Sequence, residues 1–344
     1  MKTLNPNRLW QLLAVALLTA STLPAVANTP TGDYDITLDS GGLQRSALVH
    51  VPPHADGALL PLMINYHGGG GHARSQQDYT GMNRHADRKG YIVVYPNGTG
   101  RWNNRLLTWN AGTCCGSAAR NQVDDVAFTL QLIDYLADRL PIDKTRVYAT
   151  GFSNGGMMAY RLAVEAGDRI AAIAPVAGGM VVSQFTPVRA LPILHIHSVD
   201  DPRALYHGGL GPRFPLTNQR VQHPDIDNVI NQWARFEECS ATPVRVENRS
   251  GNKKRGEGGH SATLERYENC RDSSVIALWK LRGPGHVWPG GQRNYMKRLL
   301  GASTTVIDAN EEIWKFVSQF SLVPNPTEPV STDTANDLGD LITE

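Results

Sequence analysis

A serine between glycines is the residue of this chain whose surroundings most clearly indicate chemistry. Residues 151–155 read Gly-Phe-Ser-Asn-Gly and fit the pattern G-x-S-x-G, in which the serine lies on a sharp turn between a strand and a helix. The apolar run 146–150 predicts the strand, and the apolar spacing of 157–165 predicts the helix. Ser153 is therefore the candidate nucleophile, and the alternative is a glycine-rich turn that exposes an ordinary serine.

A nucleophilic serine needs a base to accept its proton and a third group to orient that base. On a strand–turn–helix of this kind the partners follow in the order serine, acid, histidine. His286 comes after the last apolar strand, in the turn-rich stretch GPGHVWPGG, and is the candidate base. The apolar strand 193–197 runs into SVDDP, so the candidate acid is Asp200 or Asp201.

The same stretch, HIHSVDDP, also permits a different chemistry. His195 and His197 are two residues apart on a strand and face the same side, and an exposed pair of this kind can bind zinc. However, this strand has the composition of one buried on both faces, and no second ligand cluster such as H-E-x-x-H accompanies it. We therefore expect no metal, and two histidines that are satisfied within the protein core or at its rim.

A glycine-rich stretch supplies the groups that could stabilise an oxyanion. Residues 67–71 read His-Gly-Gly-Gly-Gly and follow an apolar strand, as in the oxyanion loop of lipases. Glycines allow the chain to turn its backbone N–H groups toward a substrate oxygen. We expect the amides of Asn154 and Gly69 to form the oxyanion hole, with Gly68 or Gly70 as alternatives to Gly69.

Strands and helices alternate along the chain around these motifs. Buried strands are predicted at 62–66, 92–95, 146–150, 170–176, 193–197 and 275–281. The clearest helices are predicted at 123–140, 157–165 and 310–320. This alternation predicts the α/β class, with a mostly parallel central sheet and helices on both faces.

The two ends of the chain differ in composition from the middle. Residues 1–27 combine Lys2 and Arg8 with a short apolar run and the ending Ala-Val-Ala, which is typical of a cleavable secretory signal. Residues 323–344 lack periodicity and are predicted to be a disordered tail. We expect one catalytic domain at 28–322, in a protein that is secreted to the extracellular space or the periplasm.

Charge and a long loop complete the description of this domain. The formal net charge is +1 over 344 residues, so no global field attracts nucleic acid, and no membrane association is expected after signal cleavage. The segment Arg203–Asn218 is rich in Gly and Pro and is predicted to be an irregular loop, either a lid or a plain insertion. The oligomeric state is open.

Export makes the four cysteines candidates for disulfides, and four allow three pairings. Two stretches of alternating polarity between Cys239 and Cys270 suggest a hairpin closed across its base by a bond between these two residues. Cys114 would then pair with its neighbour Cys115, in a strained ring, because adjacent Cα atoms are only about 3.8 Å apart. The second pairing stays open at this point.

Seven motifs together resemble the secreted esterases related to polyhydroxybutyrate depolymerase, a group that includes feruloyl and acetyl xylan esterases. They span residues 34–320 and read HGGGG, YPNGTG, TWNAGTCCG, VDDVAF, RVYATGFSNGGMMAYRLA, LHIHSVDDP and GPGHVWPGG. The resemblance implies an α/β-hydrolase fold and extracellular ester hydrolysis without a cofactor. It implies Ser153 as the nucleophile, His286 as the base and Asp201, the residue before Pro202, as the acid.

This chain departs from the acid motif of that group, which resembles H-G-x-x-D-P. Ser198 replaces the usual glycine, and Asp200 adds a second carboxylate. The departure concerns the geometry of the loop and leaves the position of Asp201 before the proline unchanged.

The acyl group is less well defined by the sequence. Trp109 and Trp288 are close in sequence to site residues and, like Trp102, could pack against a phenolic acid, a sugar or a polyester. Core packing is the equal alternative for Trp109, and the basic segment 252–255 is either a contact for an anionic polymer or a solvated hairpin tip.

We expect a secreted serine esterase for feruloyl-type esters on plant polysaccharide. The alternatives within the same chemistry are a depolymerase of polyhydroxybutyrate or its oligomers and an acetyl xylan esterase. A catalytically silent carbohydrate-binding protein on the same fold is the alternative from another class.

Overall fold

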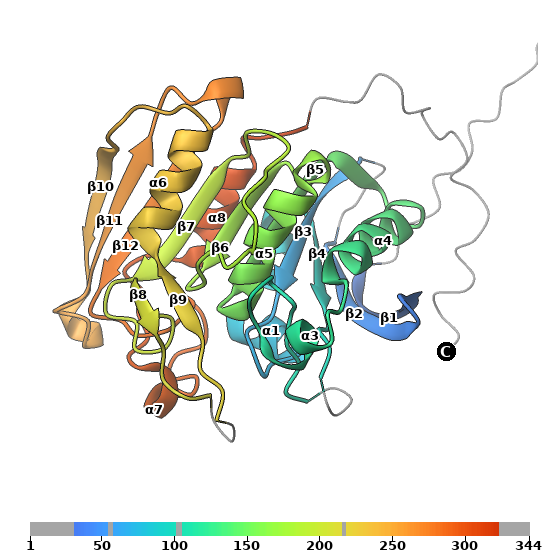
Figure 1. Cartoon of the computed structure of the whole chain (residues 1–344), viewed down its shortest axis with the longest axis horizontal. Helices are drawn as coiled ribbons and strands as arrows, with labels where there is room; N and C mark the ends of the chain where they lie inside the picture. Colours follow the sequence, from blue (N-terminus) through green and yellow to red (C-terminus); the bar gives the residue numbers. More distant parts are fainter. Residues whose placement is uncertain (1–30, 54–57, 101–104, 215–217, 323–344) are drawn as a thin grey trace, which may run out of the picture.

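A ten-stranded sheet forms the centre of the molecule (Figure 1). The computed structural model describes residues 31–53, 58–100, 105–214 and 218–322, so that the predicted signal peptide 1–27 and the predicted tail 323–344 lie outside the described residues. The strands of the sheet stand in the order β1-β2-β4-β3-β5-β6-β7-β12-β11-β10. Their bounds are β1 (Gly32–Ser40), β2 (Leu43–Val51), β3 (Leu60–Tyr66), β4 (Ile92–Pro96), β5 (Ile142–Phe152), β6 (Ala172–Val176), β7 (Ile193–Ser198), β10 (Val244–Ser250), β11 (Ser261–Tyr267) and β12 (Ile276–Arg282).

The six middle strands, from β4 to β12 in the sheet, run parallel to one another. Every residue of β3, β4, β6 and β7 is buried, as expected for strands covered on both faces. The hairpins β1–β2 and β10–β11 extend this block at its two edges with antiparallel pairs. The apolar runs predicted the positions of all six parallel strands.

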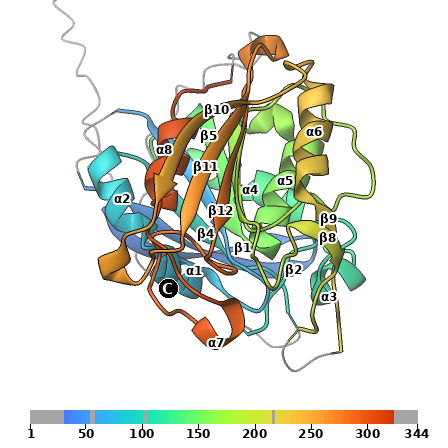
Figure 2. The same ribbon diagram turned by 90° about the vertical axis from the view of Figure 1, so that its left-hand side faces the viewer.

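Helices cover both faces of the sheet. Helices α4, α5 and α6 pack on one face, and α1, α2 and α8 pack on the other (Figure 2). Short helices α3 and α7 lie at the end of the sheet to which the parallel strands point (Figure 1). The bounds are α1 (Ala73–Thr80), α2 (Met82–Lys89), α3 (Gly116–Arg120), α4 (Asp125–Ala137), α5 (Asn154–Glu165), α6 (Ile226–Phe236), α7 (Lys297–Leu300) and α8 (Ala309–Val317). The predicted α/β class is confirmed.

The segment after the acid motif is more ordered than an irregular loop. Within it, β8 (His207–Leu210) pairs antiparallel with β9 (Gln222–Asp225). The prediction of an irregular loop over Arg203–Asn218 is therefore wrong at β8, because the partner strand of β8 lies beyond the end of that segment. The described residues contain no helix that is long and apolar enough to cross a membrane.

Candidate active site

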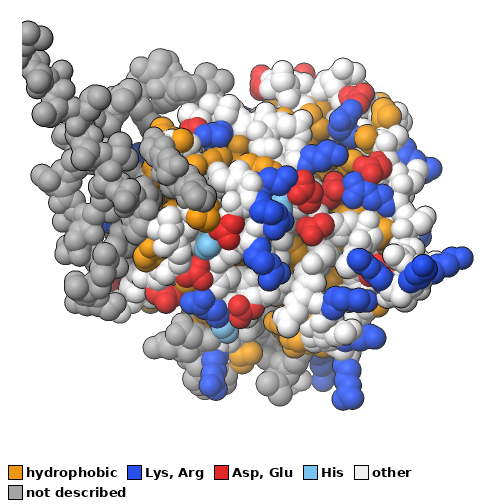
Figure 3. All heavy atoms as spheres, turned by 180° about the vertical axis from the view of Figure 1, so that it is seen from behind, with side chains coloured by type: hydrophobic (Ala, Val, Ile, Leu, Met, Phe, Trp, Pro, Cys, Tyr) orange, Lys and Arg blue, Asp and Glu red, His pale blue; other side chains and the backbone are white. Residues whose placement is uncertain are grey.

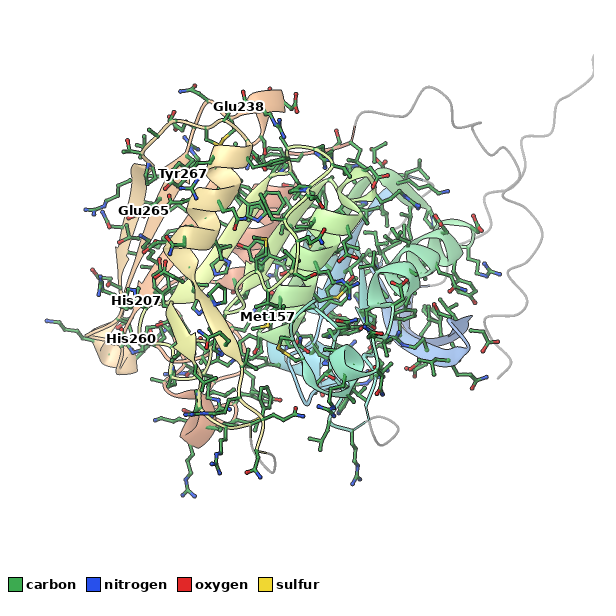
Figure 4. All side chains as sticks on the ribbon, viewed as in Figure 1. Met157, His207, Glu238, His260, Glu265 and Tyr267 are labelled. Carbon is green, nitrogen blue, oxygen red and sulfur yellow. A yellow bond between two sulfur atoms is a disulfide. The ribbon has the colours of Figure 1, made fainter. Side chains whose placement is uncertain are left out.

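Ser153 lies at the turn between β5 and α5, where the sequence pattern predicted a turn. Its backbone has φ 56° and ψ −116°, a conformation that costs a residue with a side chain on the order of 1–3 kcal/mol. The amide of Ser153 donates to the carbonyl of Val176 at 2.9 Å, and its carbonyl accepts from the amide of Met157 at 3.0 Å. These bonds to β6 and to the first turn of α5 hold the strained residue in place. Met157, in the first turn of α5, is labelled in Figure 4 and shows where Ser153 lies in the fold.

The glycines on both sides of Ser153 are required by close packing. A Cβ atom at Gly151 would lie 2.6 Å from the backbone of Gly155, and a Cβ atom at Gly155 would lie 2.7 Å from the carbonyl oxygen of His67. Neither position has room for a side chain. The two glycines thus let α5 begin directly against the end of β3, which brings the glycine-rich loop 67–71 beside Ser153.

His286 and Asp201 are joined by a hydrogen bond. The Nδ1 atom of His286 lies 2.6 Å from Oδ2 of Asp201, and both side chains are buried. Asp201 follows β7 and His286 follows β12, and these strands are parallel neighbours, so their carboxyl ends bring the two side chains together. The second oxygen of Asp201 accepts from the amides of Arg203 and Ala204 at 2.7 and 2.8 Å.

These contacts keep Asp201 in its charged form. Burial acts to raise the pKa of this carboxyl, but the charge of His286 and the hydrogen bonds from His197 and His286 outweigh burial and hold the pKa well below its usual value. A charged carboxylate can only accept hydrogen bonds. It therefore keeps a proton on Nδ1 of His286 and leaves the other ring nitrogen, Nε2, able to accept a proton.

The two histidines of HIHSVDDP form a buried chain that leads to the same carboxylate. Nε2 of His197 lies 2.8 Å from the carbonyl oxygen of Ala204, which can only accept, so Nε2 carries the proton; it also lies 3.4 Å from Asp201. Nδ1 of a neutral His197 then accepts from Nε2 of His195 at 2.9 Å. Burial and the neighbouring ring hold the pKa of His195 well below its usual value, and its Nδ1 accepts from the hydroxyl of Tyr160 at 2.9 Å.

The glycine-rich loop places one free amide next to the start of α5. The amide of Gly70 donates to the carbonyl of Leu107 at 2.7 Å, and that of Gly71 donates to the carbonyl of Gly68 at 3.0 Å. The amide of Gly69 has no acceptor among the described residues. Asn154 is the first residue of α5, where an amide has no partner within the helix. A Cβ atom at Gly69 would lie 3.6 Å from that of Asn154, so the two amides belong to adjoining segments.

Ser153 and His286 line the same cavity, which has a volume of about 320 Å³. Apolar and aromatic side chains form most of its wall, and Arg203 and His223 add polar groups; burial lowers the pKa of His223 to about 4, so this ring is neutral near pH 7. The aromatic side chains of the wall are Tyr79, Phe152, Phe214 and Tyr295.

The two tryptophans predicted as substrate contacts are buried, with 0% and 1% of their surface exposed, and lie outside the lining of this cavity. The indole of Trp109 donates to the carbonyl of His67 at 2.9 Å, and its backbone forms two hydrogen bonds with the side chain of Asn154. The indole of Trp288 donates to Asn310 at 3.1 Å. Trp109 thus braces the segments that carry the two free amides, whereas Trp102 lies outside the described residues.

Both predicted disulfides are present. Cys239 is bonded to Cys270 across the base of the β10–β11 hairpin, and Cys114 is bonded to its neighbour Cys115. The second pair lies beside the cavity, where Cys115 contributes to the wall and its sulfur lies 3.9 Å from that of Met157. The open pairing of the sequence analysis is therefore resolved in favour of the adjacent residues.

Comparison with known families agrees with this geometry. Residues 45–248 match the model of the family described as esterase PHB depolymerase. The chain belongs to this family. The family predicted from the seven motifs is thereby confirmed. The predicted enzyme class, carboxylic ester hydrolase, is confirmed as well.

Several relatives of this family have related names. Feruloyl esterase B of Piromyces equi is 28% identical over 284 residues, which are 81% of this chain and 46% of that protein. The putative esterase NocK of Nocardia uniformis subsp. tsuyamanensis is 28% identical over 284 residues, which are 81% of this chain and 80% of that protein. The chain thus spans about half the length of the first of these relatives. Among solved structures, an acetyl xylan esterase from Aspergillus awamori matches with a TM-score of 0.53 and 12% identity, over 83% of this chain and 98% of that one, which confirms the predicted α/β-hydrolase fold.

The two residues that depart from the acid motif of the family both contact the loop of His286. The hydroxyl of Ser198 donates to the carbonyl of Pro284 at 2.5 Å, and Oδ2 of Asp200 accepts from the amide of Gly283 at 2.7 Å. Asp200 is exposed, and among the described residues it forms no hydrogen bond or ion pair with His286. The departures therefore tie the acid loop to the histidine loop.

Sequence reasoning missed much of the cavity wall. Arg203, Phe214 and His223 come from the segment after the acid motif, and Tyr295 comes from the turn before α7. No local pattern marks these residues, because neither segment has the periodicity of a long strand or helix. The high content of Gly and Pro after the acid motif was the one signal in the sequence that the backbone of this segment is irregular.

Proposed function

We propose that this chain is a secreted serine esterase that forms an acyl-enzyme on Ser153. The observation that carries the proposal is the pairing of His286 with a charged, buried Asp201 at the cavity that also contains Ser153. The strained backbone of Ser153 supports it, because strain of this kind is typical of functional positions. Secretion rests on the composition of residues 1–27.

The reaction begins when the hydroxyl of Ser153 attacks the ester carbonyl while Nε2 of His286 accepts the hydroxyl proton. The carbonyl oxygen becomes an oxyanion, which accepts hydrogen bonds from the amides of Asn154 and Gly69. Asp201 stabilises the protonated imidazole through the Nδ1 hydrogen bond. His286 then gives its proton to the leaving alcohol oxygen as the bond from carbon to that oxygen breaks.

Water completes the cycle by the same steps. His286 removes a proton from a water molecule, whose oxygen attacks the acyl carbon, and the oxyanion forms again at the same two amides. Collapse of this intermediate breaks the bond to Ser153, which regains a proton from His286. The products are the free acid and the enzyme in its starting state, so that no cofactor takes part.

The proposed preferred substrate is a hydroxycinnamate ester, such as a ferulate ester, on plant polysaccharide. The cavity of about 320 Å³ is lined mainly by apolar groups, and Tyr79, Phe214 and Tyr295 offer aromatic faces to a planar phenolic ring. The relatives named as feruloyl esterases support this choice. A relative named as an acetylxylan esterase/xylanase and the family description support the second candidates, acetyl xylan and hydroxybutyrate oligomers.

A substrate panel tests this proposal. Wild type and Ser153→Ala are assayed on methyl ferulate, acetylated xylan and hydroxybutyrate oligomers, with and without a metal chelator. We expect the highest kcat/KM on methyl ferulate, no effect of the chelator and a loss of at least about 10³-fold in the variant. Binding of polysaccharide without hydrolysis of any ester would instead identify a catalytically silent carbohydrate-binding protein.

A further inference from the structure

Positive charges that have no ion pair with a described carboxylate lie at the mouth of the cavity. Met296, the N-cap residue of α7, and Leu299 within α7 form part of the wall, and between them Lys297 and Arg298 are exposed to solvent. Arg203 contributes to the wall itself, and its guanidinium lies 5.9 Å from the centre of the Phe214 ring. The three cations therefore lie at the cavity or on the short helix that forms its rim.

A second group of cations adjoins this rim. The turn between β10 and β11 carries Lys253, Lys254 and Arg255, all exposed. The guanidinium of Arg293, three residues before Met296, donates to the carbonyl of Arg255 at 3.1 Å. This bond joins the β10–β11 turn to the segment that leads into α7, and Figures 1 and 2 both show the turn and α7 at the same end of the molecule.

The cations of this band have no ion pair among the described residues, although Arg203 lies near a charged carboxylate, that of Asp201. No ion pair with a described carboxylate is formed by Arg203, Arg293, Lys297, Arg298 or the cations of the β10–β11 turn. The carboxylate in the loop of that turn, Glu257, is buried and accepts a hydrogen bond from the amide of Thr305. Some cations on other surfaces are paired, such as Arg249 with Glu247 and Glu312, and Lys280 with Asp227 and Glu265; others, such as Lys144, have no ion pair with a described carboxylate but stand apart from the cavity.

The whole chain has a formal charge of only +1, so this band is a local concentration of charge. On the face drawn in Figure 3, Lys and Arg side chains lie along the lower edge as well as across the middle. Like charges held together without partners repel one another, and an anionic ligand relieves that repulsion. A band that extends from the cavity to the β10–β11 turn suits a chain with repeated negative charges better than a ligand with one.

We propose that the natural ester is carried by an acidic polysaccharide, one whose sugar units bear carboxylates. The acyl group enters the cavity, and the polysaccharide carboxylates lie along the band formed by Arg203, Arg293, Lys297, Arg298 and the β10–β11 turn. The inference rests on the proposed esterase function and specifies the alcohol side of the substrate.

Matched substrates test this inference. Feruloyl esters on a polygalacturonate chain are compared with feruloyl esters on a neutral arabinoxylan of similar length, at low and high ionic strength. We expect kcat/KM on the acidic carrier to be about 10-fold higher at low ionic strength, and the advantage to vanish at high salt. Equal values on both carriers at low salt would overturn the inference while leaving the esterase proposal intact.

Charge reversal locates the effect. Lys297→Glu/Arg298→Glu is expected to lower kcat/KM on the acidic carrier about 10-fold and to leave p-nitrophenyl acetate hydrolysis unchanged, which also verifies folding. Lys144→Glu is the matched control, because Lys144 is exposed, has no ion pair with a described carboxylate and lies at the start of β5, opposite Ser153. An equal loss in both variants would contradict the assignment to this band.

Other anions define the remaining outcomes. A hydroxybutyrate dimer with a free carboxylate is expected to respond weakly to the double reversal, and a response as large as that of polygalacturonate would overturn the polymer assignment. Binding to vesicles of anionic phospholipid that depends on Lys297 and Arg298, without any preference for the acidic carrier, would instead make the band a membrane contact. Failure of the wild type to hydrolyse p-nitrophenyl acetate would refute the esterase proposal itself.

Discussion

Replacing Asp201 by asparagine changes which proton His286 can carry. An asparagine keeps an oxygen for the amides of Arg203 and Ala204, so its NH₂ group faces the imidazole in place of Oδ2. Because NH₂ donates, Nδ1 of His286 must then accept, and the ring proton moves to Nε2. A protonated Nε2 cannot take the proton of Ser153, and we expect kcat to fall about 10⁴-fold, as for the equivalent change in other Ser-His-Asp enzymes.

The neighbouring carboxylate provides the matched control. Asp200→Asn retains an oxygen that can accept from the amide of Gly283 and loses only the charge of one exposed hydrogen bond. Loss of about 1 kcal/mol in holding the histidine loop corresponds to a change of about 5-fold in kcat. The two substitutions thus differ by one position in sequence and by about three orders of magnitude in expected effect.

Steady-state hydrolysis of p-nitrophenyl acetate measures both variants, with circular dichroism and thermal unfolding to verify the fold. The reasoning is refuted if Asp200→Asn is the more damaging substitution. It is refuted equally if folded Asp201→Asn retains more than about one tenth of the wild-type kcat, since the carboxylate would then not set the tautomer of His286.

Three further predictions concern the surroundings of the site. Tyr160→Phe leaves Nδ1 of the buried His195 without a donor, so the free energy of unfolding in urea should fall by about 1–2 kcal/mol, and kcat should fall severalfold at constant KM; an unchanged kcat would show that the histidine chain does not support Asp201. Cys239→Ala/Cys270→Ala opens a loop with a sequence separation of 31 and should lower the same free energy by about 3–4 kcal/mol without affecting kcat; no change in stability would contradict the loop-entropy argument. Burial raises the pKa of Glu237 to about 7, against the opposing charges of Arg271 and Arg189, so stability that is complete below about pH 4.5 should decline as pH rises through 7; Glu237→Gln should flatten this decline, and a slope equal to wild type would exclude Glu237 as its source.

The parallel core and the turn at Ser153 were predictable because each follows from a local pattern. Strands such as 193–197 are short apolar runs that can only be buried, and the glycines around Ser153 leave no other packing of β5 against α5. The pairing of His286 with the second of two adjacent aspartates was fixed by resemblance to a family, since either carboxylate fits the chain order alone. The structure supplies the physical reason, because Asp200 points to the amide of Gly283.

The cavity wall was not predictable in this way. Trp109 and Trp288 stand next to site residues in sequence, yet their indoles face the interior, because a large ring gains more from burial than from a solvent-filled cavity. Phe214 and Tyr295 lie in segments without periodicity, and only long-range folding brings both of them to the wall of the same cavity. The cationic band was not predictable for the same reason, because Arg255 and Arg293 are far apart in the chain and become neighbours only in the folded protein.

The identity of the nucleophile is the claim on which the account depends, and a fluorophosphonate probe tests it directly. Wild-type protein is treated with the probe, digested and mapped by mass spectrometry, beside Ser153→Ala as a control. The account predicts one covalent adduct, on Ser153, with complete loss of esterase activity, and no adduct in the variant. Hydrolysis that persists in Ser153→Ala, or wild-type activity that survives the probe and disappears in chelator, would contradict it.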